Sequence, residues 1–267
     1  MGRILRAMPE PAASRRTRPR RDAPAWDIRW FTSIDSTNRY LLDAARAGAA
    51  EGVVAVADHQ TAGRGRLGRK WESAPGSALL VSVLLRPTLA PERLPWCSMA
   101  AGLALAEALD SVAGVEAGLK WPNDLVVRDR KLAGILAEVD LGAGAVRTVV
   151  VGVGCNLTVT AVPPDLAGIA TSVEAETGRV PNRDVVLGAF LDGLDRHLGR
   201  LDAVPEAARA RSATIGRRVR VELGPRRAVE GTALDITDSG ELAVRDVSGA
   251  VHTIAVGDVH HLRPIPD

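Results

Sequence analysis

The chain has 267 residues, 46% hydrophobic, 25% charged and 3% aromatic, which is typical of a globular protein whose core is aliphatic. No apolar run approaches the roughly 20 residues needed to span a bilayer. Two cysteines, Cys97 and Cys155, exclude a disulfide framework and a cysteine-rich zinc site, and suggest a reducing, cytoplasmic location. The Arg-rich N-terminus lacks the apolar stretch of a secretory signal.

The net charge of +2 is concentrated at the N-terminus, where residues 1–22 hold seven arginines and two acidic residues. The remainder has 27 basic and 30 acidic residues, so the high pI is no argument for nucleic-acid binding. We expect residues 1–25 to form a disordered Pro/Arg-rich arm. A large domain over 26–212 and a small β-barrel over 213–267 should follow.

The large domain begins with a loosely alternating strand over 27–34, and Ser36 or Thr37 is placed to cap a helix over 39–47. Apolar strands at 53–58 and 77–85 precede an Ala-rich run that predicts a buried helix. This helix is expected over 97–112. Meander strands over 119–127, 131–140 and 146–157 and a helix over 187–201 complete the large domain. Short strands are expected over 219–221, 228–236, 241–247 and 251–256. The last four have all-β spacing with intervening turns, which indicates the barrel.

Rare residue types cluster in short motifs. The chain has 31 arginines but only three lysines, one glutamine and four asparagines. A lysine that persists against such a bias can mark a site that needs a compact ammonium rather than a planar guanidinium. Chance survival explains any single one of them, but not the clustering of all three lysines, the glutamine and three asparagines within the motifs described next.

The segment Gly63-Arg-Gly-Arg-Leu-Gly68 follows a strand and fits the G-x-G-x-x-G pattern of dinucleotide-binding folds. Its context excludes that fold, because a loop and a strand follow instead of a helix and no acidic residue ends a second strand. A phosphate-binding P-loop is excluded too, since no Gly-Lys-Ser/Thr follows. Four cations within seven residues predict a loop that is poorly ordered alone and orders around a polyanion. The alternative is a solvated basic turn.

The meander carries a second group of motifs. Lys120-Trp-Pro-Asn-Asp124 enters one strand, Lys131 begins the next, and Gly134 lies mid-strand, where glycine weakens a sheet unless something approaches closely. Gly152-Val-Gly-Cys-Asn156 repeats this pattern on the third strand. Bulges and turn chemistry explain each motif taken alone.

Together these motifs resemble the biotin–protein ligases in order and spacing, over roughly residues 27–263. The resemblance rests on Ser36–Asn38, Gln60 with the loop 63–71, the motifs at 120–124 and 131–138, and 152–156. It implies an α/β (α+β) catalytic domain related to class II aminoacyl-tRNA synthetases, with a mixed sheet, flanking helices and an SH3-like C-terminal β-barrel. The implied reaction joins biotin and Mg-ATP to biotinyl-5′-AMP and then biotinylates a lysine of biotin carboxyl carrier protein in acyl-CoA carboxylases. Mg²⁺ would be an activating ion, with no tightly bound prosthetic group.

The resemblance also implies residue roles. Lys131, Arg66 and Arg69 would be catalytic. The biotin-binding residues would be Ser36, Thr37, Asn38, Gln60, Gly63, Arg64, Gly65, Arg66, Lys131 and Gly134. The ATP-binding residues would be Arg64, Arg69, Trp71, Lys120, Asn123, Asp124 and Asn156. Asp124 is a candidate for Mg²⁺ or for the acceptor lysine, and the sequence leaves that choice open.

Some members of this family carry an N-terminal winged helix-turn-helix that represses biotin genes. Only about 26 residues precede the first predicted strand, too few for a three-helix DNA-binding domain. The sequence therefore predicts a monofunctional ligase without sequence-specific DNA or membrane partners. Lipoyl transferases share the fold, and a catalytically inactive carrier-binding relative remains a second hypothesis. The adjacent His260-His261 pair is expected on the module surface.

Overall fold

A computed structural model describes residues 13–20, 25–142, 145–224 and 227–262. Its larger part is an eight-stranded mixed sheet in the order β1-β2-β3-β4-β8-β7-β6-β5. Only β2 and β3 pair in parallel. The strands are β1 (Ser14–Arg18), β2 (Trp26–Phe31), β3 (Val53–Ala57), β4 (Ala78–Leu85), β5 (Gly118–Lys120), β6 (Asp124–Val127), β7 (Arg130–Gly142) and β8 (Ala145–Asn156).

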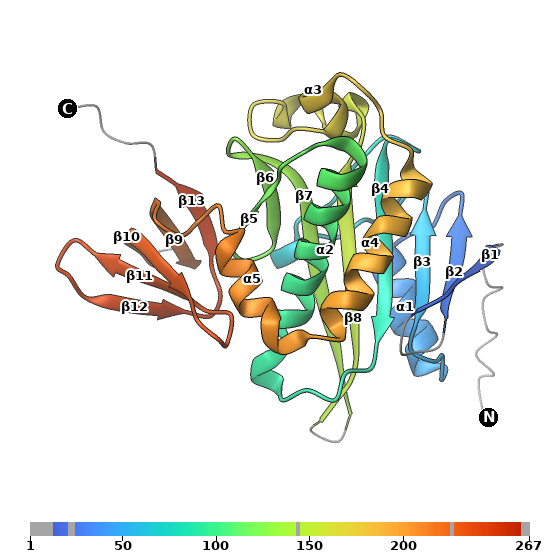
Figure 1. The fold of residues 1–267 in the computed structure, drawn as a ribbon, viewed down its shortest axis with the longest axis horizontal. Helices are drawn as coiled ribbons and strands as arrows, with labels where there is room; N and C mark the ends of the chain where they lie inside the picture. Colours follow the sequence, from blue (N-terminus) through green and yellow to red (C-terminus); the bar gives the residue numbers. More distant parts are fainter. Residues whose placement is uncertain (1–12, 21–24, 143–144, 225–226, 263–267) are drawn as a thin grey trace, which may run out of the picture.

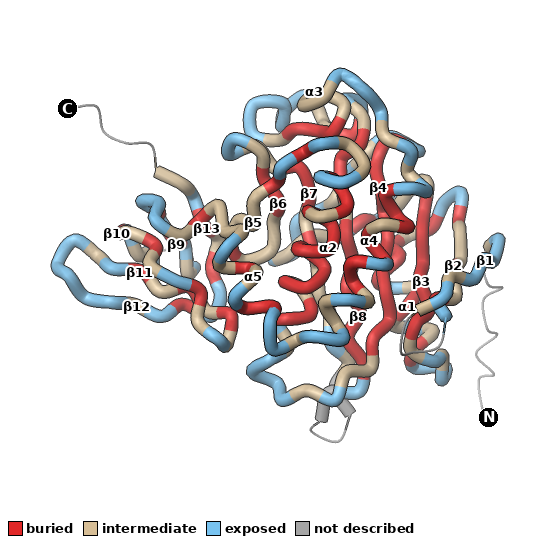
Figure 2. Tube along the Cα trace, in the orientation of Figure 1, coloured by how far each residue is buried: buried red, intermediate tan, exposed pale blue. Residues whose placement is uncertain are grey.

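Helices cover both faces of this sheet (Figure 1). Because successive strand residues point to opposite faces, the apolar strands β3 and β4 feed two cores. The first core packs against α2 and α4, and the second packs against α1. The helices are α1 (Thr37–Arg46), α2 (Pro95–Ala113), α3 (Val173–Thr177), α4 (Arg183–Leu198) and α5 (Val204–Ala210). Figure 2 shows that β3 and β4 are buried along their length, as are the central parts of β8 and α2.

The C-terminal module is a five-stranded antiparallel sheet in the order β12-β11-β10-β9-β13. It lies beside β5 and α5, at the opposite end of the molecule from β1 (Figure 1). Indole N–H groups of Trp96 and Trp121 donate to module carbonyls, those of Asp238 at 2.7 Å and Gly240 at 2.8 Å. The strands are β9 (Arg218–Gly224), β10 (Arg227–Ile236), β11 (Leu242–Asp246), β12 (Val251–Ile254) and β13 (Asp258–His261).

The mixed sheet, its flanking helices and the all-β module confirm the predicted fold class, while some local elements differ from the prediction. The segment 119–127 is two strands, because Trp121–Asn123 form a turn containing a cis Trp121–Pro122 peptide. The strand β13 was not predicted. His261 is not on the module surface: its side chain is 5% exposed and hydrogen-bonds to Asp129 at 2.9 Å. The boundary at 212/213 remains a prediction.

The expected disorder of the N-terminal arm is wrong for residues 14–18, which form β1 against β2; residues 1–12 and 21–24 lie outside the described residues. Its arginines pair with acidic residues that are distant in sequence. Arg16 binds Asp184 at 3.1 Å, Arg18 binds Asp192 at 2.5 Å, and Arg20 binds Asp195 at 2.8 Å and Glu51 at 3.1 Å.

Cys97 and Cys155 are buried free thiols. Burial raises the pKa of Cys97 to about 11 and that of Cys155 to about 12. Reactive cysteines need thiolate character, so both thiols belong to the core. Among the described residues, no helix is long and apolar enough to cross a membrane.

The buried ion pairs of Arg20 predict a stabilising role for the arm. The Arg20 side chain is 5% exposed, and its guanidinium lies 4.0 Å from the ring centroid of Trp26. Removing one partner of a buried pair costs about 3–5 kcal/mol, so Arg20→Ala should lower the free energy of unfolding by about 3 kcal/mol in denaturant titrations. Arg15→Ala is the control, because the Arg15 side chain is 64% exposed and exposed ion pairs contribute little to stability. Equal effects of the two substitutions would contradict the prediction.

Candidate functional site

The Gly/Arg loop folds back on itself as a short hairpin. The N–H of Trp71 donates to the Gly63 carbonyl at 3.0 Å, and that of Gly65 to the Arg69 carbonyl at 2.7 Å. A Cβ at Gly63 would lie 2.4 Å from the Trp71 carbonyl oxygen, so this closure requires glycine. At the tip, Leu67 has a φ of +56° and is 70% exposed.

Three of the four loop cations, Arg64, Arg66 and Arg69, have carboxylate, amide or carbonyl partners. That the loop orders around a polyanion stays a prediction. Arg64 binds Glu138 on β7 at 3.0 Å. Arg69 pairs with Asp258 on β13. Since opposite charges offset the repulsion among the cations, the loop takes a defined shape between the large sheet and the module.

Arg66 is the least exposed loop arginine, with 20% of its side chain accessible. It donates to the Asn123 side-chain oxygen at 3.2 Å and to the Gly257 carbonyl at 3.4 Å. Burial lowers the pKa of Arg66, and it also lowers that of Lys120. Both cations are thus partly desolvated, a condition in which a charge binds an anion more strongly than it does in water.

Polar side chains at the start of α1 form a buried network. The Ser36 side chain caps the helix. Thr37 donates its N–H to the Gln60 Oε1 atom at 2.8 Å, and the Ser82 hydroxyl bonds to Thr37 and Asn38 at 2.6 Å each. The Asn38 amide donates to Glu138 at 2.8 Å. Hydroxyls, amides and a carboxylate therefore stand in one connected chain.

Three glycines on β7 and β8 carry no side chain of their own, so side chains from other segments lie close to the strand backbone. Gly134 pairs with Gly154 across the strands. A Cβ at Gly154 would lie 2.5 Å from the Trp71 indole, and one at Gly152 would lie 2.1 Å from the Asn38 Oδ1 atom. We call Gly134, Gly152 and Gly154 the glycine track. It lets an aromatic ring and an amide lie directly against the backbone.

Lys131 lies at the end of the glycine track. Its ammonium is 2.8 Å from Asp124 and 5.6 Å from the Trp71 ring centroid. Its Nζ atom lies 3.1 Å from the Cβ that an alanine at Gly134 would carry. Asn123, next to Asp124, donates its amide to the Ile135 carbonyl at 2.6 Å.

Most predicted site residues converge on this region of the large sheet, but three of them have structural contacts of their own. Asn156 donates to the Thr171 carbonyl at 2.9 Å, Ser36 caps α1, and the 59% exposed Arg69 side chain pairs with the module. Sequence reasoning missed Ser82, Glu138 and Asp258. The signal for Ser82 was visible, since it is the one polar residue in the strand Ala78–Leu85.

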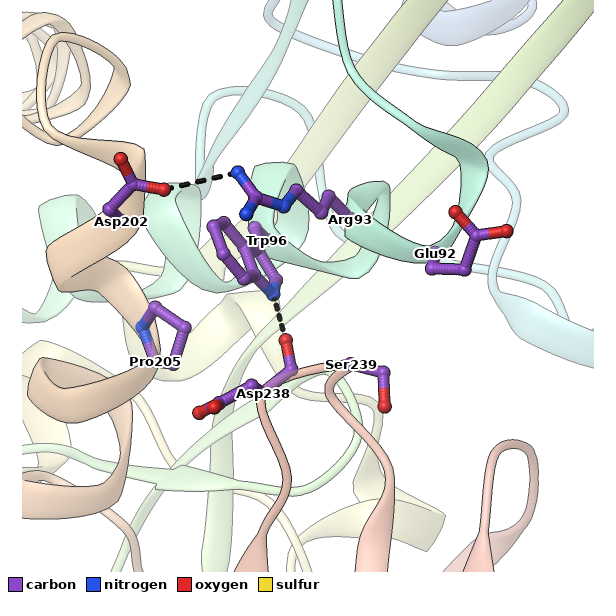
Figure 3. A pocket seen from close by; sticks show the side chains of 7 residues that line it. All are labelled: Glu92, Arg93, Trp96, Asp202, Pro205, Asp238 and Ser239. Carbon is purple, nitrogen blue, oxygen red and sulfur yellow. Dashed lines mark hydrogen bonds and ion pairs between the residues drawn. The ribbon is translucent and has the colours of Figure 1, made fainter.

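A cavity of about 320 Å³ lies away from these motifs, between the start of α2 and the loop joining β10 to β11. Figure 3 shows the Arg93–Asp202 pair and the Trp96 bond to Asp238 across it. Its lining is Glu92, Arg93, Trp96, Asp202, Pro205, Asp238 and Ser239. None of these residues belongs to the motifs, so the candidate site lies at the motif side chains and not at this cavity.

The arrangement suits a ligand with a flat or apolar body and an anionic end. The glycine track offers backbone that a flat group can approach closely, as the Trp71 indole and the Asn38 amide do here. The α1 network offers paired amides and hydroxyls, and the loop with Lys131 offers cations. Guanidinium groups bind phosphate and carboxylate oxygens in forked geometry. The site therefore supports binding and electrostatic stabilisation of anions more than acid–base chemistry.

Comparison with known proteins agrees with this geometry. Residues 30–156 match the biotin/lipoate A/B protein ligase family and residues 214–262 match the biotin protein ligase C terminal domain. A biotin–[acetyl-CoA-carboxylase] ligase of Mycobacterium tuberculosis is 45% identical over 240 residues, 85% of this chain and 86% of that protein. The bifunctional ligase/repressor BirA of Bacillus subtilis is 35% identical over 160 residues, 59% of this chain and 49% of that protein.

A solved structure is similar over nearly the same extent. The biotin protein ligase of Aquifex aeolicus in complex with biotin and ATP superposes with a TM-score of 0.76 at 27% identity, covering 89% of this chain and 99% of that one. Identity, coverage and fold thus agree with the motifs: the chain belongs to the biotin protein ligase family.

Proposed function

We propose that this protein activates biotin with ATP to biotinyl-5′-adenylate and then transfers the biotinyl group to a lysine of a biotin carboxyl carrier domain. The observation that carries the proposal is the convergence of Lys131 and Trp71 on the glycine track, with Arg64 bound to Glu138 on the same strand β7. Relatives named as biotin–[acetyl-CoA-carboxylase] ligases support the reaction. The match to the biotin protein ligase C terminal domain favours biotin over lipoate as the substrate.

The proposed chemistry has two balanced steps. A carboxylate oxygen of biotin attacks the α-phosphorus, the bond to the bridging oxygen breaks, and pyrophosphate leaves. The neutral amine of the acceptor lysine then attacks the acyl carbon, AMP leaves, and the new amide loses a proton. Orientation and charge stabilisation provide most of the catalysis in such transfers, which matches the cation-rich site.

The residues divide this work between them. Thr37, Asn38 and Gln60 would bind the ureido ring of biotin, with Gly134 letting the bicyclic body lie against the strand. Lys131 would bridge the biotin carboxylate and the α-phosphate. In the structure the cations are held by carboxylates, such as Glu138 for Arg64. We propose that ligand oxygens take the place of these partners.

Trp71, Asn123, Asn156 and the arginines 64 and 69 would serve the nucleotide side. Mg²⁺ in nucleotide sites is commonly held by one or two carboxylates together with phosphates. Within the described ranges no group of three His, Cys, Asp or Glu side chains could hold a metal ion. Asp124, 2.8 Å from Lys131, would be a candidate carboxylate for Mg²⁺ or for the acceptor lysine, and the ion would neutralise phosphate charge.

The experiment that tests the function is biotin-dependent pyrophosphate release, followed by biotin transfer to a purified carrier domain. Lys131→Ala should lower adenylate formation by about 10²–10³, the typical effect of losing one preorganised contact to a transition state. Lys131→Arg should also be strongly impaired, because a planar guanidinium places its charge differently. Near-normal turnover by the Arg variant would contradict the need for an ammonium. Absence of biotin-dependent release by the unmodified protein would refute the function.

The glycine track yields a second prediction. In Gly152→Ala the new Cβ would meet the Asn38 Oδ1 atom at 2.1 Å, so Asn38 must leave its bonds to Ser82 and Glu138. We expect biotin affinity, measured calorimetrically, to fall at least about tenfold, since each lost hydrogen bond to a buried group costs about 1–3 kcal/mol. Gly168→Ala is the control, because it meets nothing within 4 Å. Unchanged affinity of the Gly152 variant would remove Asn38 from the biotin site.

Arg66 separates the two half-reactions. A forked contact to phosphate is worth about 1.5–3 kcal/mol, or roughly ten- to a hundredfold in residence. Arg66→Gly should therefore still make biotinyl-adenylate but release it early, and the free adenylate should biotinylate bystander proteins. Streptavidin blotting of a mixture with a protein lacking a carrier domain measures this release. The control is Lys70→Gly, which also makes the loop more flexible. This variant should still retain the adenylate. Turnover without bystander labelling would show that Arg66 does not retain the intermediate.

A further inference from the structure

The backbone of Lys131 is clamped by a segment outside the sheet, Ile169–Thr171. The Lys131 N–H donates to the Ile169 carbonyl at 2.8 Å, and the Lys131 carbonyl accepts from the Thr171 N–H at 2.8 Å. These bonds form a parallel β-bridge between Lys131 and Ala170. The position of the Lys131 backbone, and with it that of its side chain, therefore depends on the position of this segment.

Glu176 on α3 connects the segment Ile169–Thr171, which we call the clamp, to β7. Its side chain is only 4% exposed. The Oε1 atom accepts from Arg130 at 2.6 Å and from the Thr171 hydroxyl at 2.6 Å, and Oε2 accepts from Arg128 at 2.8 Å. A single buried carboxylate thus holds the residue before Lys131 and the residue that binds its carbonyl.

We infer that Glu176 is a positioning residue for adenylate formation, acting through Lys131. The inference rests on the proposed function. Glu176 uses both oxygens on its protein partners and is not aimed at the glycine track. Because a displacement of 1 Å in a reacting group can cost about a hundredfold in rate, a clamp on both backbone groups of Lys131 has a direct catalytic consequence.

A purely structural role would be to anchor α3 and the loop before it. Breaking a buried ion pair by removing one partner is strongly destabilising, so loss of stability alone does not distinguish the roles. The distinguishing property is dependence on Lys131. If Glu176 acts through that side chain, its substitution has no further effect once the ammonium is gone.

The test is a double-mutant cycle on the rate of biotinyl-adenylate formation, measured by mass spectrometry in single turnovers with enzyme in excess. Glu176→Gln should slow the reaction about ten- to a hundredfold in the Lys131 protein. In the Lys131→Ala background the same substitution should change the residual rate less than about twofold, as expected for coupled residues. Thr171→Val repeats the cycle if the Gln variant does not fold, because it removes the hydroxyl and keeps the N–H.

Glu174→Gln is the matched control, the same change on the same helix. Its carboxylate accepts from the Val159 N–H at 2.8 Å and has no contact with the clamp, so the rate should be unchanged. Slowing by equal factors with and without Lys131, or no slowing with Lys131 present, would overturn the positioning role. An unmodified protein that makes no adenylate would refute the proposed function instead, so the two failures are distinguishable.

Discussion

The site depends on the absence of side chains at three positions of the sheet. Glycines at 134, 152 and 154 expose the backbone of β7 and β8 on the face that carries α1, and the Trp71 indole and the Asn38 amide occupy that surface. Any larger residue there would separate the loop and α1 from the strands that carry Lys131. Glycine weakens a strand interior, and here the weak positions are flanked by the buried strand β4 and its helices, which supply the lost packing.

Acidic residues hold the cations of this site at fixed places. Glu138, Asp124 and Asp258 come from β7, β6 and β13, and each contacts one or more of the cations Arg64, Lys131 and Arg69. A cluster of like charges would otherwise repel and spread. The carboxylates therefore keep the loop compact, and they offer the same oxygen chemistry as an anionic ligand.

Much of the fold could be predicted from the sequence, because the buried strands and the Ala-rich helix α2 carry strong local patterns. The strand β1 could not be predicted, since its arginines reach acids in α4 that lie up to 174 residues away. The short strand β13 has little periodicity of its own.

The site was predictable where rare residue types mark it, as Lys131, Gln60 and Asn38 do. Asp258 and Glu176 belong to common residue types, and their partners lie far away in sequence or across a turn. No local pattern indicates such residues, and only the folded chain brings them together. Ser82 lies between these cases, because a hydroxyl in an apolar strand is visible in the sequence while its partners are not.

The contact between Arg69 and Asp258 joins residues 189 positions apart. Ribosomes add about 5–20 residues per second, so the loop arginines exist for about 10–40 s before their module partner is synthesised. During that interval Arg64 and its partner Glu138 are both present in the nascent chain, whereas Arg69 lacks its partner from the module. Completion of the site is thus tied to completion of the polypeptide, and a chain that stops before β13 has the sheet and the loop without Asp258, the carboxylate that pairs with Arg69.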